Sequence, residues 1–62
     1  MCYFEFNWTA NCWQFRIADR WTDYRGQRSW QSLKDIRDLV AQNGCELVKT
    51  DTRTYQLMCK AL

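Results

Sequence analysis

The amino-acid sequence predicts a small α+β domain in which one helix packs on one face of an antiparallel sheet. One segment, residues 29–44, carries apolar residues at the three- and four-residue spacing of a helix. The segments before and after it alternate apolar and polar residues, which is typical of half-buried strands. The predicted order is strand, strand, helix, strand, strand, giving a sheet of four strands, or of five if a short strand precedes the helix. Because the chain has 62 residues, we expect residues 1–62 to form a single domain.

Residues 2–8 and 13–17 are predicted to form the first hairpin, because both segments place large apolar side chains at alternate positions. The connection 9–12 contains no glycine, so we expect a four-residue loop rather than a tight two-residue turn. In this register every large apolar side chain of the hairpin lies on one face. The expected pairs are Trp8 with Trp13, Phe6 with Phe15, and Phe4 with Ile17.

Residues 19–28 are polar, turn-forming around Gly26, and rich in arginine and aromatic residues. Trp21, Thr22 and Tyr24 have a preference for strands, so a short third strand is one interpretation of this segment. The other is a loop that leads the chain into the helix.

The helix is predicted within residues 29–44. Two N-caps fit the pattern: Ser29, or Ser32 with Asp35 three residues later as in a capping box. A glycine after Asn43 predicts the end of the helix, because glycine tolerates the left-handed conformation found there. The expected buried stripe consists of Trp30, Leu33, Ile36, Leu39 and Val40.

A second hairpin is predicted from residues 45–50 and 54–61, joined by a turn at 51–53. The pattern does not separate two registers, in which Leu47 shares a face with either Tyr55 or Leu57. In one of them Cys45 stands opposite Cys59, where a disulfide is geometrically conceivable.

The composition argues against catalysis, cofactors and metal binding. The chain contains no histidine, so a cysteine nucleophile would have no imidazole base. Zinc sites usually show closely spaced ligand pairs, whereas the four cysteines are far apart in the sequence. We therefore expect a non-enzymatic protein that holds neither a cofactor nor a metal ion.

The sequence also predicts where the protein works. No basic segment followed by an apolar run stands at the N-terminus, and no stretch approaches the roughly 18 apolar residues of a membrane helix. We therefore expect a cytoplasmic location without membrane contact. In a reducing compartment the four cysteines are expected to remain thiols.

The strongest candidate binding surface is the arginine- and aromatic-rich segment 16–30. Its candidate residues are Arg16, Arg20, Trp21, Tyr24, Arg25, Arg28 and Trp30. Arginine and tryptophan are common hot spots of protein interfaces, and the same residues pair with phosphates and stack on bases. Asp19 and Asp23 interrupt the positive charge, which weakens the case for nucleic acid.

Segment 16–30 can also be an ordinary solvated loop whose Trp residues tuck under the edge of the sheet, but the aromatic content favours a protein partner. Four Trp, three Tyr and three Phe are more than so small a core should need, since each aromatic side chain buries roughly 150–250 Å². We therefore predict a protein–protein contact, including homodimerisation, with RNA or DNA binding through segment 16–30 as the alternative. The net charge of +2 permits nucleic-acid binding without arguing for it.

Two further surfaces are candidates. The outer face of the sheet would carry Tyr3, Glu5 and Gln14, and an ordinary solvated face is the favoured interpretation. The edges of the sheet invite strand addition, including dimerisation through a shared sheet.

The segment around Asn43-Gly44-Cys45-Glu46-Leu47-Val48 resembles the helix-then-strand unit of HicA-type RNA-binding toxins. In that family a short helix ends in a glycine and continues into a strand of similar sequence. The resemblance covers residues 32–50, less than a third of the chain, and the family's histidine on the following strand has no counterpart. The resemblance therefore implies no activity for this chain. It implies only an association with RNA.

Overall fold

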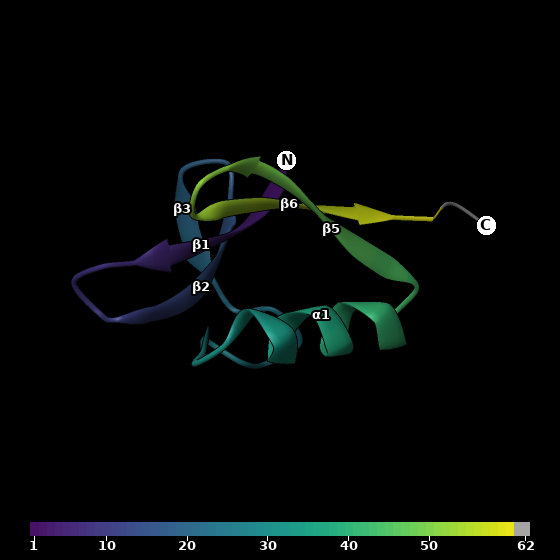
Figure 1. Ribbon diagram of the computed structural model, residues 1–62, viewed down its shortest axis with the longest axis horizontal. Helices are drawn as coiled ribbons and strands as arrows, with labels where there is room; N and C mark the ends of the chain where they lie inside the picture. The colour runs from purple at the N-terminus through teal and green to yellow at the C-terminus, as the bar shows by residue number, and fades with distance from the viewer. Residues whose placement is uncertain (61–62) are drawn as a thin grey trace.

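The computed structural model describes residues 1–60 and has an α+β fold. One helix lies on one face of an antiparallel sheet, as predicted (Figure 1). The elements, in chain order, are β1 (Cys2–Asn7), β2 (Cys12–Ile17), β3 (Arg20–Thr22), β4 (Ser29–Trp30), α1 (Leu33–Gln42), β5 (Cys45–Asp51) and β6 (Thr54–Cys59).

The sheet has six strands in the order β3-β2-β1-β6-β5, and β4 also pairs with β2. The prediction of four or five strands in the order strand, strand, helix, strand, strand is therefore wrong. The short strand that was one interpretation of residues 19–28 is present as β3, without Tyr24, whereas β4 was not predicted. Both strands share the outer edge of β2, where Phe15 pairs with Thr22 and Trp13 pairs with Trp30. Strands of three and two residues are too short to show an alternating pattern in the sequence. They are defined only by their pairing with β2.

The register of the first hairpin differs from the prediction by two residues. Phe6 lies opposite Trp13 and Asn7 lies opposite Cys12, so the loop is 8–11 rather than 9–12. The cause is local: the side-chain oxygen of Asn7 accepts hydrogen bonds from the amides of Thr9 and Ala10, at 2.9 and 3.3 Å, and starts the turn. Asn11 ends the turn in the left-handed conformation, with φ 56°. Because the shift is even, every side chain stays on its predicted face.

Of the two candidate N-caps, the capping-box alternative is confirmed, and Ser29 is wrong because it lies on β4. Ser32 is the N-cap, and its hydroxyl accepts a hydrogen bond from the Asp35 amide at 3.2 Å. The stripe facing the sheet is centred on Ile36 and Val40. Trp30, expected on the helix, instead lies on β4. Gly44 follows the helix with φ 74°, as expected for a left-handed C-terminal residue.

The second hairpin adopts the register in which Leu47 lies opposite Leu57 and Cys45 lies opposite Cys59. The two cysteines form a disulfide, so the expectation that all four cysteines are thiols is wrong for this pair. The Lys60 amide donates to the Gly44 carbonyl at 3.2 Å, which makes Cys45 and Cys59 a non-hydrogen-bonded pair. Such pairs approach most closely, here with Cα atoms 4.0 Å apart. The strand predicted over 54–61 ends at Cys59, and Ala61 lies outside the described residues.

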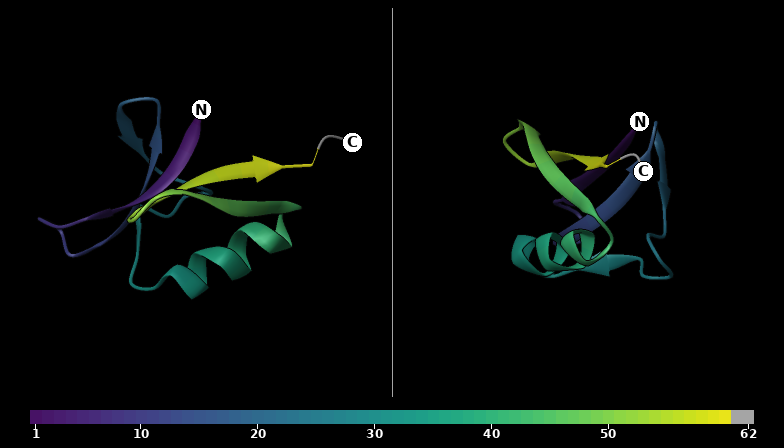
Figure 2. Two further views of the ribbon diagram at one scale, coloured as in Figure 1. Left: turned by 45° about the horizontal axis from the view of Figure 1, so that its top comes forward. Right: turned by 90° about the vertical axis from the view of Figure 1, so that its right-hand side faces the viewer.

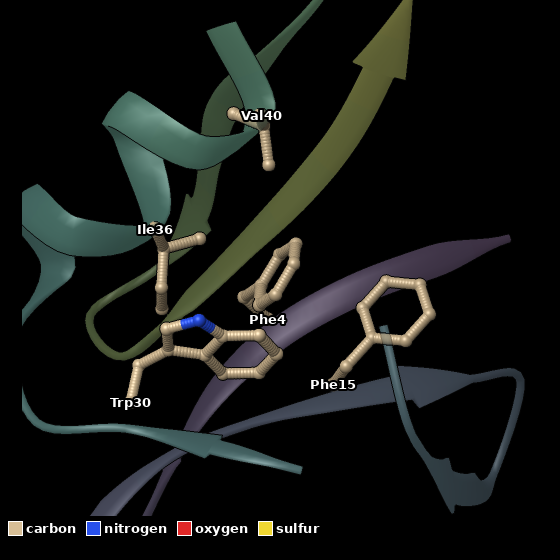
Figure 3. Close-up of a cluster of buried hydrophobic side chains, with 5 residues drawn as sticks. All are labelled: Phe4, Phe15, Trp30, Ile36 and Val40. Carbon is tan, nitrogen blue, oxygen red and sulfur yellow. The ribbon is translucent and has the colours of Figure 1, made fainter. Parts of the chain in front are cut away.

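The core lies between the sheet and α1, around Phe4. Its ring is fully buried and contacts Phe15 at 4.8 Å and Trp30 at 5.3 Å between ring centroids. Ile36 and Val40 lie over these rings from the helix (Figure 3). Residues of β1, β2, β4 and α1 therefore meet in one cluster around Phe4, and the core uses only one face of the sheet.

Candidate functional site

The face of the sheet opposite α1 is not covered by any helix or strand of residues 1–60 (Figure 2). Five side chains form one row across this face, because each residue of the row is the strand partner of the next. The row consists of Trp21 on β3, Arg16 on β2, Tyr3 on β1, Gln56 on β6 and Val48 on β5. Met1 and Met58 lie beside it, and we call these seven residues the open face.

Arg16 lies between Trp21 and Tyr3 in this row, and three contacts hold its side chain in place. Its Nε donates to the Glu5 carboxylate at 3.1 Å, and its guanidinium lies 4.7 Å from the centroid of the Tyr3 ring. Its Nη1 donates to the Ala18 carbonyl. The ion pair balances the charge of Arg16, and the ring holds its guanidinium against the sheet. The open face therefore presents an ordered, nearly neutral surface around Arg16.

Apolar exposure is concentrated on the open face. Met1, Trp21, Val48 and Met58 are four of the six large apolar side chains that are exposed in the described chain. The sulfur of Met1 accepts hydrogen bonds from the Tyr3 hydroxyl at 3.6 Å and the Gln56 amide at 3.4 Å. Methionine adapts its shape to a partner readily, so these side chains suit contact with another apolar surface.

A hollow of about 300 Å³ adjoins the open face at Trp21. It is lined by Asn7, Gln14, Trp21, Thr22, Asp23 and Arg28. The polar groups partly satisfy one another: Asn7 donates to Gln14 at 2.7 Å, and Arg28 donates to Asp23 at 3.2 Å. Trp21 supplies an apolar wall, so the hollow can receive one side chain that ends in a hydrogen-bonding group.

The seven predicted site residues fall into three groups. Arg16 and Trp21 belong to the open face and Arg28 lines the hollow, so these three come together. Arg20 and Arg25 are exposed and form no ion pair within residues 1–60. Tyr24 and Trp30 pack into the core, where Trp30 is only 4% exposed and Tyr24 lies against Phe4 and Phe15.

Several residues of the open face are absent from the predicted site. The alternation of the first strand predicts Tyr3 on the outer face of the sheet, but an ordinary solvated face is the favoured interpretation there, so Tyr3 is not among the seven predicted site residues. Gln56 and Val48 join the row only through the pairing of β1 with β6, which links segments far apart in the sequence. That pairing has no local sequence signal.

A second exposed aromatic group lies at the tip of the first hairpin, on the side of the sheet that carries α1. Phe6 contacts both Trp8 and Trp13 edge to face, and Trp13 contacts Tyr55. The guanidinium of Arg53 lies 3.9 Å from the centroid of the Trp8 ring. Nucleic-acid-binding proteins use aromatic side chains beside arginine as platforms on which bases stack. Here, however, Arg53 already covers one face of Trp8.

Other chemistry is sparse in the described part of the chain. Residues 1–60 contain no group of three or more His, Cys, Asp or Glu side chains placed to hold a metal ion. Cys2 and Cys12 are free cysteines. Lys34 donates to Asp38 at 2.8 Å on the outer side of α1, and this hydrogen bond raises the pKa of Lys34. No helix within residues 1–60 has the length and apolar character needed to cross a membrane.

Comparisons with known protein families, with curated proteins and with solved structures gave no match. The resemblance of residues 32–50 to HicA-type toxins therefore gains no support from them.

Proposed function

We propose that this protein is a non-enzymatic binding module that contacts a protein partner, including a second copy of itself, through the open face. The observation that carries the proposal is the row that crosses five of the six strands, in which exposed Trp21 lies beside a charge-balanced Arg16. Arginine and tryptophan on an ordered surface are typical anchors of protein interfaces. Because Glu5 balances Arg16, a polyanion gains little from it, whereas an apolar partner surface can pack on the row.

The proposal is tested by sedimentation velocity over a range of protein concentrations, at low and high salt. We expect association that is insensitive to salt and that is weakened by Trp21→Ala. The matched control is Trp8→Ala, which removes an equally large exposed indole from the other side of the sheet. A protein that remains monomeric at the highest attainable concentration refutes the self-associating form. Equal weakening by both variants refutes the assignment to the open face.

Nucleic-acid binding is a second candidate function, supported by Arg20 and Arg25. Both are exposed without an ion pair among residues 1–60, and Trp21 lies close to Arg20 in sequence. Phosphate contacts release counterions, so binding of a short single-stranded RNA must weaken steeply as salt rises. Binding that is absent at low salt, or that is unaffected by an Arg20→Gln and Arg25→Gln double variant, contradicts this candidate.

We retain a cytoplasmic location as a proposal, and the Cys45–Cys59 pair tests it. A reducing compartment would keep both residues as thiols, whereas an oxidising one would preserve the disulfide. Rapid alkylation of thiols in intact cells, followed by mass spectrometry, distinguishes the two. Alkylation at all four cysteines supports the proposal, and protection of Cys45 and Cys59 alone refutes it.

A further inference from the structure

One edge of the sheet is formed by β5, which has β6 as its only strand neighbour in the described chain. In an antiparallel pair, the residues of a strand alternate between bonding to the neighbour and pointing away from it. The hydrogen bond from Lys60 to Gly44 fixes this alternation. Glu46 and Val48 therefore bond to β6, whereas the amides and carbonyls of Cys45, Leu47 and Lys49 point to the free edge.

The free edge has a defined usable length. A register irregularity between Lys49 and Asp51 interrupts the regular pairing of β5. Such bulges twist an edge away from further pairing, so the regular part is Cys45–Lys49. A segment of about five residues can pair along it.

A hollow of about 220 Å³ runs beside this edge, between β5 and α1. Its lining residues are Arg37, Val40, Ala41, Cys45, Glu46 and Leu47. Figure 2 shows α1 running alongside β5, so a strand added to the edge would lie next to the helix. Alternate side chains of that strand would point toward α1 and into the hollow. Its walls at Val40, Ala41 and Leu47 suit an apolar side chain.

Two cationic side chains beside the hollow favour an acidic segment. Glu46 also lines the hollow, but strand alternation places its side chain with that of Val48 on the opposite face of β5, away from Leu47 and Lys49. Arg37 lines the hollow from the helix, and Lys49 shares the helix-facing side of β5 with Leu47. Neither forms an ion pair within residues 1–60. A second copy of β5, added antiparallel about a two-fold axis, would bring its own Lys49 and Arg37 to this same side. Like charges in neighbouring strands are destabilising, so a second copy is the poorer occupant.

We infer that the free edge of β5 binds an extended, acidic and apolar peptide segment of a partner protein by strand addition. The segment pairs with the backbone of Cys45, Leu47 and Lys49. One of its apolar side chains fills the hollow between β5 and α1, and a flanking carboxylate faces Arg37 and Lys49. Backbone pairing supplies affinity and the hollow supplies selectivity. This surface is separate from the open face, so the inference does not depend on the function proposed above.

The first experiment is selection from a displayed library of random octapeptides on the disulfide-bonded protein. We expect the selected peptides to share an apolar residue flanked by Asp or Glu. Enrichment of basic peptides, or no enrichment at all, overturns the inference.

Binding of a selected peptide is then compared between two charge-matched variants. Ala41→Glu places a carboxylate in the hollow, one helical turn from Arg37, and should weaken binding at least about tenfold. Gln42→Glu adds the same charge at the next position of the helix, outside the hollow, and should leave binding unchanged. Equal affinities of the two variants overturn the inference.

Hydrogen exchange tests the strand pairing directly. In the free protein the amides of Glu46 and Val48 should be protected and those of Cys45, Leu47 and Lys49 should exchange rapidly. The peptide should protect the latter three. A chain this short can be synthesised chemically, so the Leu47 amide can also be N-methylated, which blocks the edge without touching β6. Its fold is verified by the protection of Glu46 and Val48.

The outcomes separate the possible occupants. Loss of peptide binding on Leu47 N-methylation, with Trp21→Ala binding normally, supports strand addition. Protection of Leu47 in the free protein, rising with concentration and lost on N-methylation, assigns the edge to a second copy instead and overturns the inference. Peptide protection that appears only around Trp21 places the contact on the open face and also overturns it.

Discussion

Reduction of the Cys45–Cys59 disulfide should lower the free energy of unfolding by about 3 kcal/mol. The two cysteines are 14 positions apart, so the bond closes a short loop that consists of β5, its turn and β6. In the chain-entropy treatment, a loop of about 15 residues restricts the unfolded chain by about 3 kcal/mol at 25 °C. A domain of this length typically has a total free energy of unfolding of about 3–9 kcal/mol, so the loss is a large share of it.

The measurement is urea unfolding of the same chain with the disulfide intact and after reduction. With a urea dependence of about 1 kcal/mol per molar, the midpoint should fall by about 3 M. Mass spectrometry of alkylated samples verifies the oxidation state of each sample. Cys2→Ser is the control, because Cys2 is free and its loss should leave the difference between the two states unchanged.

Two results would refute this reasoning. Midpoints that agree within about 0.5 M would show that the bond does not restrict the unfolded chain as the loop length requires. If the oxidised and reduced forms of Cys2→Ser had the same urea midpoint, the effect would belong to the free thiol of Cys2 rather than to Cys45 and Cys59.

Three further changes test the packing and the local signals. Phe4→Ala removes the fully buried ring of the core and should cost about 3–5 kcal/mol, leaving much of the protein unfolded by circular dichroism; a native spectrum with an unchanged thermal midpoint contradicts the central role of Phe4. Ser32→Ala should lower the free energy of unfolding, measured with urea, by about 1 kcal/mol, and Ser29→Ala should lower it less. A larger loss in Ser29→Ala would contradict the assignment of Ser32 as the N-cap. Asn7→Ala removes the acceptor that starts the hairpin turn and should destabilise by about 1 kcal/mol; unaltered stability would mean that the register has another cause.

Local signals predicted the parts of the fold that depend on neighbours in sequence. The start of α1 at Ser32 and its end before Gly44 follow from side chains and backbone conformations within one turn of each end. The inward face of the first hairpin follows from alternation alone. Its register did not, because the same faces result from any even shift, and the Asn7 side chain selects one of them.

The candidate site was predicted less completely, because exposure depends on packing between distant segments. Trp30 and Tyr24 have the composition of a binding surface, yet both lie against Phe4, far from them in the sequence. Conversely, Tyr3 joins Gln56 and Val48 in one row only after β1 pairs with β6. No local sequence pattern predicts the burial of Trp30 and Tyr24, or the row formed by Tyr3, Gln56 and Val48.

The sequence by itself determined the α+β class, the end of α1 and two candidates for its start, and which side chains of each long strand share a face. These properties follow from periodicity and capping, which act over a few neighbouring residues. Only the tertiary structure decided the strand order, the Cys45–Cys59 bond, and which aromatic residues are exposed. The strand order and the exposure of the aromatic residues require β1 to lie between β2 and β6, and that choice depends on how well the whole core packs around Phe4. The disulfide requires the one register of β5 with β6 in which Cys45 lies opposite Cys59.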